Sequence, residues 1–125
     1  MNLKEFLEKI TIGNNFEYSV LVNNEGVKIE EFGQPNPKYI NDPYNLYLLN
    51  ADVIKNTFKF LEGQLTPQFI SQGTRNLIIF KPSPTLVLSC IYDDDRSFID
   101  TIEVSEHLNL EINEYINKLF PNTNV

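Results

Sequence analysis

Few side chains in this sequence have both the type and the spacing that catalysis requires. Cys90 is the only cysteine and His107 the only histidine among the 125 residues. Cys90 lies in the apolar run L-V-L-S-C-I-Y, which predicts a buried, inert thiol rather than a nucleophile. No cysteine, serine or carboxylate stands at a known catalytic spacing from His107, so we expect a histidine on the surface or at a helix end.

Three consecutive aspartates, residues 93–95, are the remaining candidate for a metal site. An EF-hand loop places its carboxylates at alternating positions, with a glycine and a distal glutamate in register, and this sequence has neither at the required distance. Carboxylates at the entrance of a helix are stabilised by the helix dipole. The run therefore predicts a solvated helix entrance, and we expect no bound metal and no cofactor.

The sequence lacks the common motifs by which known enzyme classes are recognised. It contains no glycine-rich phosphate loop and no G-x-S-x-G, H-E-x-x-H or C-x-x-C motif. The two arginines, Arg75 and Arg96, have no feature of a catalytic arginine, and we expect each to be an exposed turn residue. The sequence thus predicts a protein that is not an enzyme.

The composition indicates a single domain over residues 1–125, because 42% of them are hydrophobic. The net charge of −7 argues against nucleic acid or an anionic membrane as the main partner. No apolar run approaches the roughly 20 residues of a membrane span, and the N-terminus lacks the apolar core of a signal peptide. With one cysteine and no internal disulfide, we expect a reduced, cytoplasmic protein.

Hydrophobic periodicity predicts eight elements in the order α-β-β-α-β-β-β-α. They are a helix at 2–11, strands at 16–22 and 27–32, a helix at 43–62, strands at 68–73, 77–80 and 86–92, and a helix at 98–120. The two strands 77–80 and 86–92 are apolar on both faces, which predicts central positions in a sheet. The polar strand 68–73 suits an edge. We expect turns at 74–76 and 82–84. Ser97 with Asp100 resembles a capping box, and the apolar stripe of the last helix begins at Phe98. Off-stripe residues in this helix leave a kink near 107–109 open.

The predicted helix 43–62 has more apolar surface than one sheet can cover. It has one apolar stripe for the sheet and a second stripe beside it, formed by Tyr47, Ile54, Phe58 and Leu61. A broad exposed apolar patch is uncommon on a monomer, so this stripe favours contact with a second copy of the chain. Alternatively, the loop 33–41 or the terminal helices cover it.

Three stretches of the sequence resemble the roadblock family (dynein light chain roadblock type). They are the hairpin S-V-L-V-N-N-E-G-V-K-I, the long helix after a loop, and the meander F-I-S-Q-G-T-R-N-L-I-I-F-K-P-S-P-T-L-V-L-S-C-I-Y-D followed by a helix. The hairpin has Asn-Glu before Gly26, where many relatives have Asp and a basic residue. The resemblance implies an α/β (α+β) domain with a five-stranded antiparallel sheet flanked by helices.

The same resemblance implies a dimer, since relatives pack their central helices together and pair edge strands. The implied interface residues here are Tyr47, Ile54, Phe58, Leu61, Phe69 and Ser71. The implied function is a non-enzymatic scaffold or regulator, paired with itself or a paralogue, that binds a Ras-like small GTPase or a larger assembly.

The segment L-V-L-S-C-I-Y-D-D also resembles the late strand of profilins, so a profilin-like protein that binds actin is the alternative. Profilins usually carry a tryptophan in the N-terminal helix, and this chain has none. A small-molecule sensor is a third hypothesis, but no convergent polar pocket is recognisable from the sequence.

Overall fold

The computed structural model describes residues 1–35, 56, 59, 62–63, 66–72 and 75–121. The helices are α1 (Leu3–Gly13) and α4 (Phe98–Leu119), and the strands are β1 (Tyr18–Asn23), β2 (Lys28–Gly33), β3 (Gln68–Gln72), β4 (Arg75–Ser83) and β5 (Leu86–Asp93). Most of the predicted loop 33–41 and of the predicted helix 43–62 lies outside the described residues. Asn56 and Lys59, which are described, are helical and exposed.

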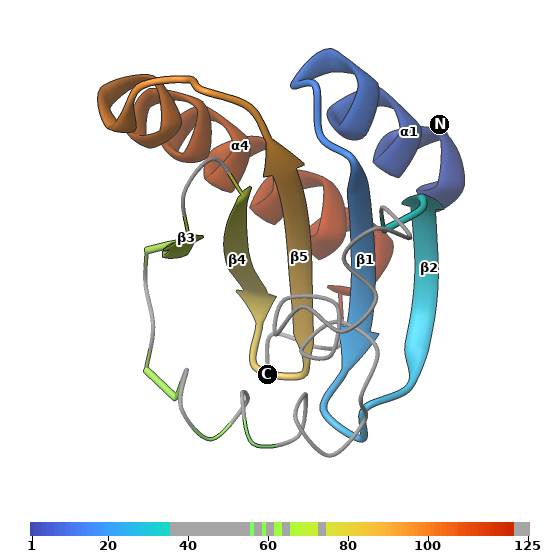
Figure 1. The fold of residues 1–125 in the computed structure, drawn as a ribbon. Helices are drawn as coiled ribbons and strands as arrows, with labels where there is room; N and C mark the ends of the chain where they lie inside the picture. Colours follow the sequence, from blue (N-terminus) through green and yellow to red (C-terminus); the bar gives the residue numbers. More distant parts are fainter. Residues whose placement is uncertain (36–55, 57–58, 60–61, 64–65, 73–74, 122–125) are drawn as a thin grey trace.

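The five strands form one sheet in the order β2-β1-β5-β4-β3, with every neighbouring pair antiparallel (Figure 1). The predicted five-stranded antiparallel sheet of an α+β domain is confirmed. Strands β4 and β5 are interior and β3 is at one edge, as the sequence predicted. Strand β1 pairs with both β2 and β5, so it joins the N-terminal hairpin to the later strands.

Both helices pack on the same face of the sheet (Figure 1). The core on this face combines apolar residues of the two helices with alternate residues of β1, β4 and β5. The helices contribute Phe6, Leu7, Ile10, Leu108, Ile112 and Ile116, each at most 3% exposed. The Phe6 and Tyr115 rings stack with centroids 4.0 Å apart, which ties α1 to α4 directly. No helix in the described segments is long and apolar enough to cross a membrane.

The opposite face of the sheet carries a second buried apolar cluster. Its members are Tyr18, Val20, Val22, Leu77, Ile79, Val87 and Ile91. They alternate along β1, β4 and β5 with the residues that face the helices, as the twofold period of a strand requires. Burial on both faces explains why the sequences of β4 and β5 are almost continuously apolar.

The helix ends follow from capping side chains. The Asn2 side chain accepts a hydrogen bond from the Glu5 amide at 2.8 Å, and the Glu5 carboxylate accepts one from the Asn2 amide at 3.3 Å. This capping box starts α1, which runs two residues past its predicted end. Ser97 caps α4 through the Asp100 amide at 3.1 Å, as predicted. Helix α4 is uninterrupted across 107–109, where the sequence left a kink open.

Strand β4 is longer than the sequence predicted. The prediction placed turns on both sides of 77–80, whereas the strand begins at Arg75, which pairs with Asp93 of β5. At the other end of β4, the register of its pairing with β5 shifts between Phe80 and Ser83. Pro82 therefore lies in an irregular part of the ladder. Proline lacks an amide hydrogen, so within a sheet it is tolerated at such irregularities.

Gly33 ends β2 at a point where the backbone needs glycine. Its φ is +84°, and a Cβ at this position would collide with the Glu17 carbonyl oxygen and lie 3.2 Å from the Tyr18 Cα. Gly13 at the end of α1 has nothing within 4 Å of its ideal Cβ. The two glycines therefore form a matched pair, one constrained and one not.

We expect Gly33→Ala to lower the free energy of unfolding by about 1–3 kcal/mol, because it adds both a left-handed φ and a backbone clash. Gly13→Ala should leave stability unchanged or raise it by up to about 1 kcal/mol. Urea denaturation followed by circular dichroism measures both. Equal stability of the two variants would show that the β1–β2 approach at Gly33 is not tight.

Candidate functional site

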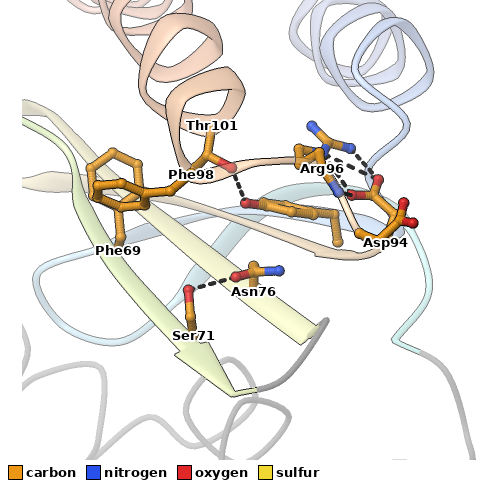
Figure 2. Close-up of a pocket in the computed structure, with 9 residues that line it drawn as sticks. Phe69, Ser71, Asn76, Asp94, Arg96, Phe98 and Thr101 are labelled. Atoms are coloured by element: carbon orange, nitrogen blue, oxygen red, sulfur yellow. Dashed lines mark hydrogen bonds and ion pairs between the residues drawn. The ribbon is translucent and has the colours of Figure 1, made fainter.

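A cavity of about 370 Å³ lies between the ends of three strands and the first turn of α4 (Figure 2). The sheet side is formed by Phe69, Ser71, Asn76 and Tyr92. These residues share a face because Phe69 pairs with Ile78, Ser71 with Asn76, and Asn76 with Tyr92. The opposite side is formed by Asp94, Asp95, Arg96, Phe98 and Thr101.

Arg96 organises one side of this cavity. Its Nε donates to Asp94 Oδ1 at 2.8 Å and its Nη2 donates to Asp94 Oδ2 at 2.6 Å. The same Nη2 donates to the Asn14 carbonyl at 2.8 Å, which links the β5–α4 connection to the end of α1. The guanidinium carbon lies 4.0 Å from the centre of the Tyr92 ring, within the range of a cation–π contact.

The expectation that Arg96 is an exposed turn residue is therefore wrong, because its side chain is 15% exposed and has several partners. The expectation of a solvated aspartate run also fails at Asp94. The hydrogen bonds from Arg96 hold the pKa of Asp94 below its usual value, and the same contact raises the pKa of Arg96. Asp94 is thus an ionised structural partner of Arg96.

The hydroxyl and amide groups of the cavity are hydrogen-bonded to one another. Tyr92 and Thr101 share a hydrogen bond of 2.6 Å, and Ser71 donates to Asn76 Oδ1 at 2.5 Å (Figure 2). This arrangement pairs no nucleophile with a general base. Within the described residues, no group of three or more histidine, cysteine, aspartate or glutamate side chains could hold a metal ion. The geometry suits binding through the cavity wall and rim.

The rim carries an apolar surface and an acidic group. Phe98 is 66% exposed, and its ring meets Phe69 edge-on with centroids 6.2 Å apart. Asp95 is exposed and makes no hydrogen bond or ion pair with the described residues. The sequence pattern placed Phe98 in the buried stripe of the last helix. The pattern could not show that the first turn of α4 extends beyond the core.

The residues singled out from the sequence as possible nucleophile and base do not meet. Cys90 is fully buried, and burial raises the pKa of its thiol to about 12, which confirms the prediction of an inert cysteine. His107 is exposed on α4, next to Glu103, Glu106 and Leu110 in a shallow hollow. Its predicted surface position is confirmed.

Arg75 has a structural position that the sequence did not reveal. It is 4% exposed in β4, and its Nη1 lies 3.1 and 3.2 Å from the two carboxylate oxygens of Glu17. Glu17 directly precedes β1, so this ion pair spans the intervening strand β5. The expectation of an exposed turn arginine is wrong here as well.

Of the six predicted interface residues, Phe69 and Ser71 lie on the edge strand β3. Phe69 is partly buried against the helix-side core, and Ser71 is exposed. Both face the cavity, while Ile70 between them points to the other face of the sheet. The remaining four, Tyr47, Ile54, Phe58 and Leu61, lie outside the described residues.

We expect Asp94→Asn to lower the free energy of unfolding at neutral pH by about 1–3 kcal/mol, because it weakens a charge-assisted pair with Arg96. The folded pKa of Asp94 is depressed, so its contribution is complete above about pH 4 and is lost as pH falls through the lower folded value. The stability difference between wild type and variant should therefore shrink in acid. Urea denaturation between neutral and acidic pH measures it.

Asp95→Asn is the matched control, because Asp95 has no such partner among the described residues and should give little change at any pH. A similar loss of stability for both variants would mean that negative charge at residues 94 and 95, and not the pair of Asp94 with Arg96, stabilises the β5–α4 connection.

Comparisons with known proteins find similarity in structure but not in sequence. No protein-family model matches the chain, and no curated protein matches it. Among solved structures, MglB of Myxococcus xanthus matches with a TM-score of 0.58 and 18% identity, over 89% of this chain and 94% of that one.

Two further matches have different names. A Roadblock/LC7 domain from Streptomyces avermitilis matches with a TM-score of 0.60 and 10% identity, over 93% of this chain and 98% of that one. Profilin II of Acanthamoeba castellanii matches with a TM-score of 0.60 and 12% identity, over 91% of this chain and 98% of that one. The chain therefore has the fold that MglB, Roadblock/LC7 and profilin structures share.

Proposed function

We propose that this protein is a non-enzymatic, cytoplasmic scaffold or regulator that forms a dimer and binds a Ras-like small GTPase or a larger assembly. The observation that carries the proposal is the uncharged strand β3 at the edge of the described sheet, in a fold shared with MglB and Roadblock/LC7 structures.

The two edges of the sheet differ in how well they resist pairing with another strand. Strand β2 carries Lys28, Glu30 and Glu31, and its register shifts opposite Leu21 and Val22 so that Ile29 is left out of the pairing. Lys4 of α1 also donates to the Glu31 carbonyl at 2.6 Å. Charges and bulges are the usual protection of an edge strand.

Within the part of the chain that the structure describes, strand β3 has none of these protections. Its sequence, Q-F-I-S-Q, contains no charge and no proline, and its pairing with β4 is regular over all five residues. An uncharged, regular edge presents backbone groups to a further strand. A second copy of β3 is the partner we propose, which would extend the sheet across the two chains.

The predicted apolar stripe Tyr47, Ile54, Phe58 and Leu61 completes the proposed interface with Phe69 and Ser71. Self-association is supported by the likeness to an MglB structure described as having a tetrameric arrangement, at a TM-score of 0.61 and 16% identity. The copy could also be a paralogue with the same edge.

We propose that this chain binds its partner without catalysing a reaction itself. The described residues pair no nucleophile with a base, so an effect on GTP hydrolysis would come from positioning the switch loops of the GTPase. The net charge of −7 favours a partner with a basic or neutral face over nucleic acid or an anionic membrane.

A profilin-like function is the second candidate, because profilin structures match the fold as well as the roadblock ones do. The TM-scores for profilin II and profilin IA of Acanthamoeba castellanii are 0.60 and 0.59. This reading would make the protein a monomer that binds actin.

We expect wild type to sediment as a dimer and Ile70→Lys to sediment as a monomer, because a lysine on β3 protects the edge. Ile29→Lys on β2 is the matched control and should remain dimeric. The two isoleucines are 37% and 38% exposed, so the substitutions differ mainly in the edge that they modify. Analytical ultracentrifugation measures the masses, and circular dichroism checks folding.

A monomeric wild type would refute the proposed dimer. A folded, dimeric Ile70→Lys variant would instead place the interface away from β3.

We also expect affinity capture from the native lysate to enrich a Ras-like GTPase and no actin, with mass spectrometry as the readout. Purified protein should leave the polymerisation rate of actin unchanged in a fluorescence assay, because the proposed dimeric scaffold, unlike a profilin-like monomer, does not bind actin. Slowed polymerisation by a monomeric protein would favour the profilin-like function.

A further inference from the structure

The cavity between β3 and α4 shares Phe69 and Ser71 with the proposed dimer interface, and its other lining residues give it the features of a binding site for a further partner. Its volume of about 370 Å³ is at the lower end of the range for ligand sites. Such a volume accommodates one or two large side chains of a bound segment. The cavity lies on the helix-covered face, so its occupation does not require the outer backbone of β3.

The polar side chains that line the cavity are poorly available to bind a small polar metabolite. The Tyr92 and Thr101 hydroxyls bond each other, and Ser71 bonds Asn76, so these groups already have partners (Figure 2). Binding them to a new ligand would first break these hydrogen bonds. The groups that remain open to an occupant are at the rim.

The apolar part of the rim is the edge-on pair of Phe69 and Phe98. Phe98 is 66% exposed at the very start of α4, and Ile99 beside it is 69% exposed. Large apolar side chains exposed together next to a cavity are typical of a protein-binding surface. An apolar side chain placed against Phe98 would remove this surface from water.

The charged part of the rim is negative. Arg96 is paired with Asp94, so these two charges largely offset each other. Asp95, which lines the cavity beside them, is an exposed carboxylate. Asp100 in the first turn of α4 is also exposed but lies outside the cavity lining. The mouth therefore has charge complementarity for a cation, in a chain whose net charge is also negative.

We propose that this cavity binds a linear segment of a partner protein in which a large apolar side chain stands next to lysine or arginine. The apolar side chain packs against Phe69 and Phe98, and the cation forms an ion pair with Asp95. The inference rests on the proposed scaffold function, because it assigns a surface on which a partner of the scaffold binds.

The test begins with selection of random linear peptides displayed on phage against the full-length wild-type chain. We expect the enriched peptides to share a large apolar residue adjacent to lysine or arginine. A synthetic peptide of the enriched sequence, with a fluorescent label, then serves as the probe for fluorescence anisotropy at physiological salt.

Two single substitutions on the rim should each weaken binding of this peptide about tenfold, as expected for a central contact. They are Asp95→Lys, which reverses the charge, and Phe98→Ser, which removes the ring. Both positions are exposed, so both variants should fold, and circular dichroism confirms it. Glu114→Lys is the control, since it makes the same charge change more than a Debye length along α4 and should change affinity less than about twofold.

The proposal is overturned if no such sequence is enriched, or if the selected peptide binds Asp95→Lys and Phe98→Ser as tightly as wild type. Failure of the scaffold function gives a different result. A monomeric wild type that captures no GTPase but binds the peptide through Asp95 and Phe98 would retain this site and remove the dimer. Loss of the peptide site with an intact dimer would remove this site alone.

Discussion

The pairing of β1 with β5 is the contact on which the rest of the structure depends. Six residue pairs, from Tyr18 with Ile91 to Asn23 with Leu86, join parts of the chain about 70 positions apart. This ladder joins the N-terminal hairpin to β5 and, through β5, to β4 and β3, and it creates the continuous surface on which α1 and α4 pack. A sheet whose central pairing is so distant in sequence has a high loop-closure cost and is expected to fold slowly.

Arg96 carries this long-range order into the candidate site. Its side chain connects Asp94 after β5 with the Asn14 carbonyl at the end of α1, and it covers the Tyr92 ring. The start of α4 is therefore held relative to both the sheet and α1. The position of Phe98 at the cavity rim is a consequence of that constraint.

Local sequence patterns predicted the features that depend on interactions between residues close together in the sequence. Alternation located the strands, serine before a helical run located the Ser97 cap, and an apolar run predicted that Cys90 is buried. Patterns could not place the arginines, because their partners are distant. Arg75 pairs with Glu17 across 58 positions, and Arg96 reaches Asn14 across 82. The exposure of Phe98 could not be predicted either, because it depends on where the tertiary core ends along α4.

The difference between the two sheet edges also sets a limit on assembly. An association through β3 that follows twofold symmetry is isologous, so each copy uses its uncharged edge once and leaves β2 on the outside. Strand β2, with its lysine, two glutamates and bulge, then terminates the enlarged sheet at both ends. Such a dimer would close as a pair, because the charges and the bulge of β2 disfavour the further strand pairing by which a sheet grows into a fibre.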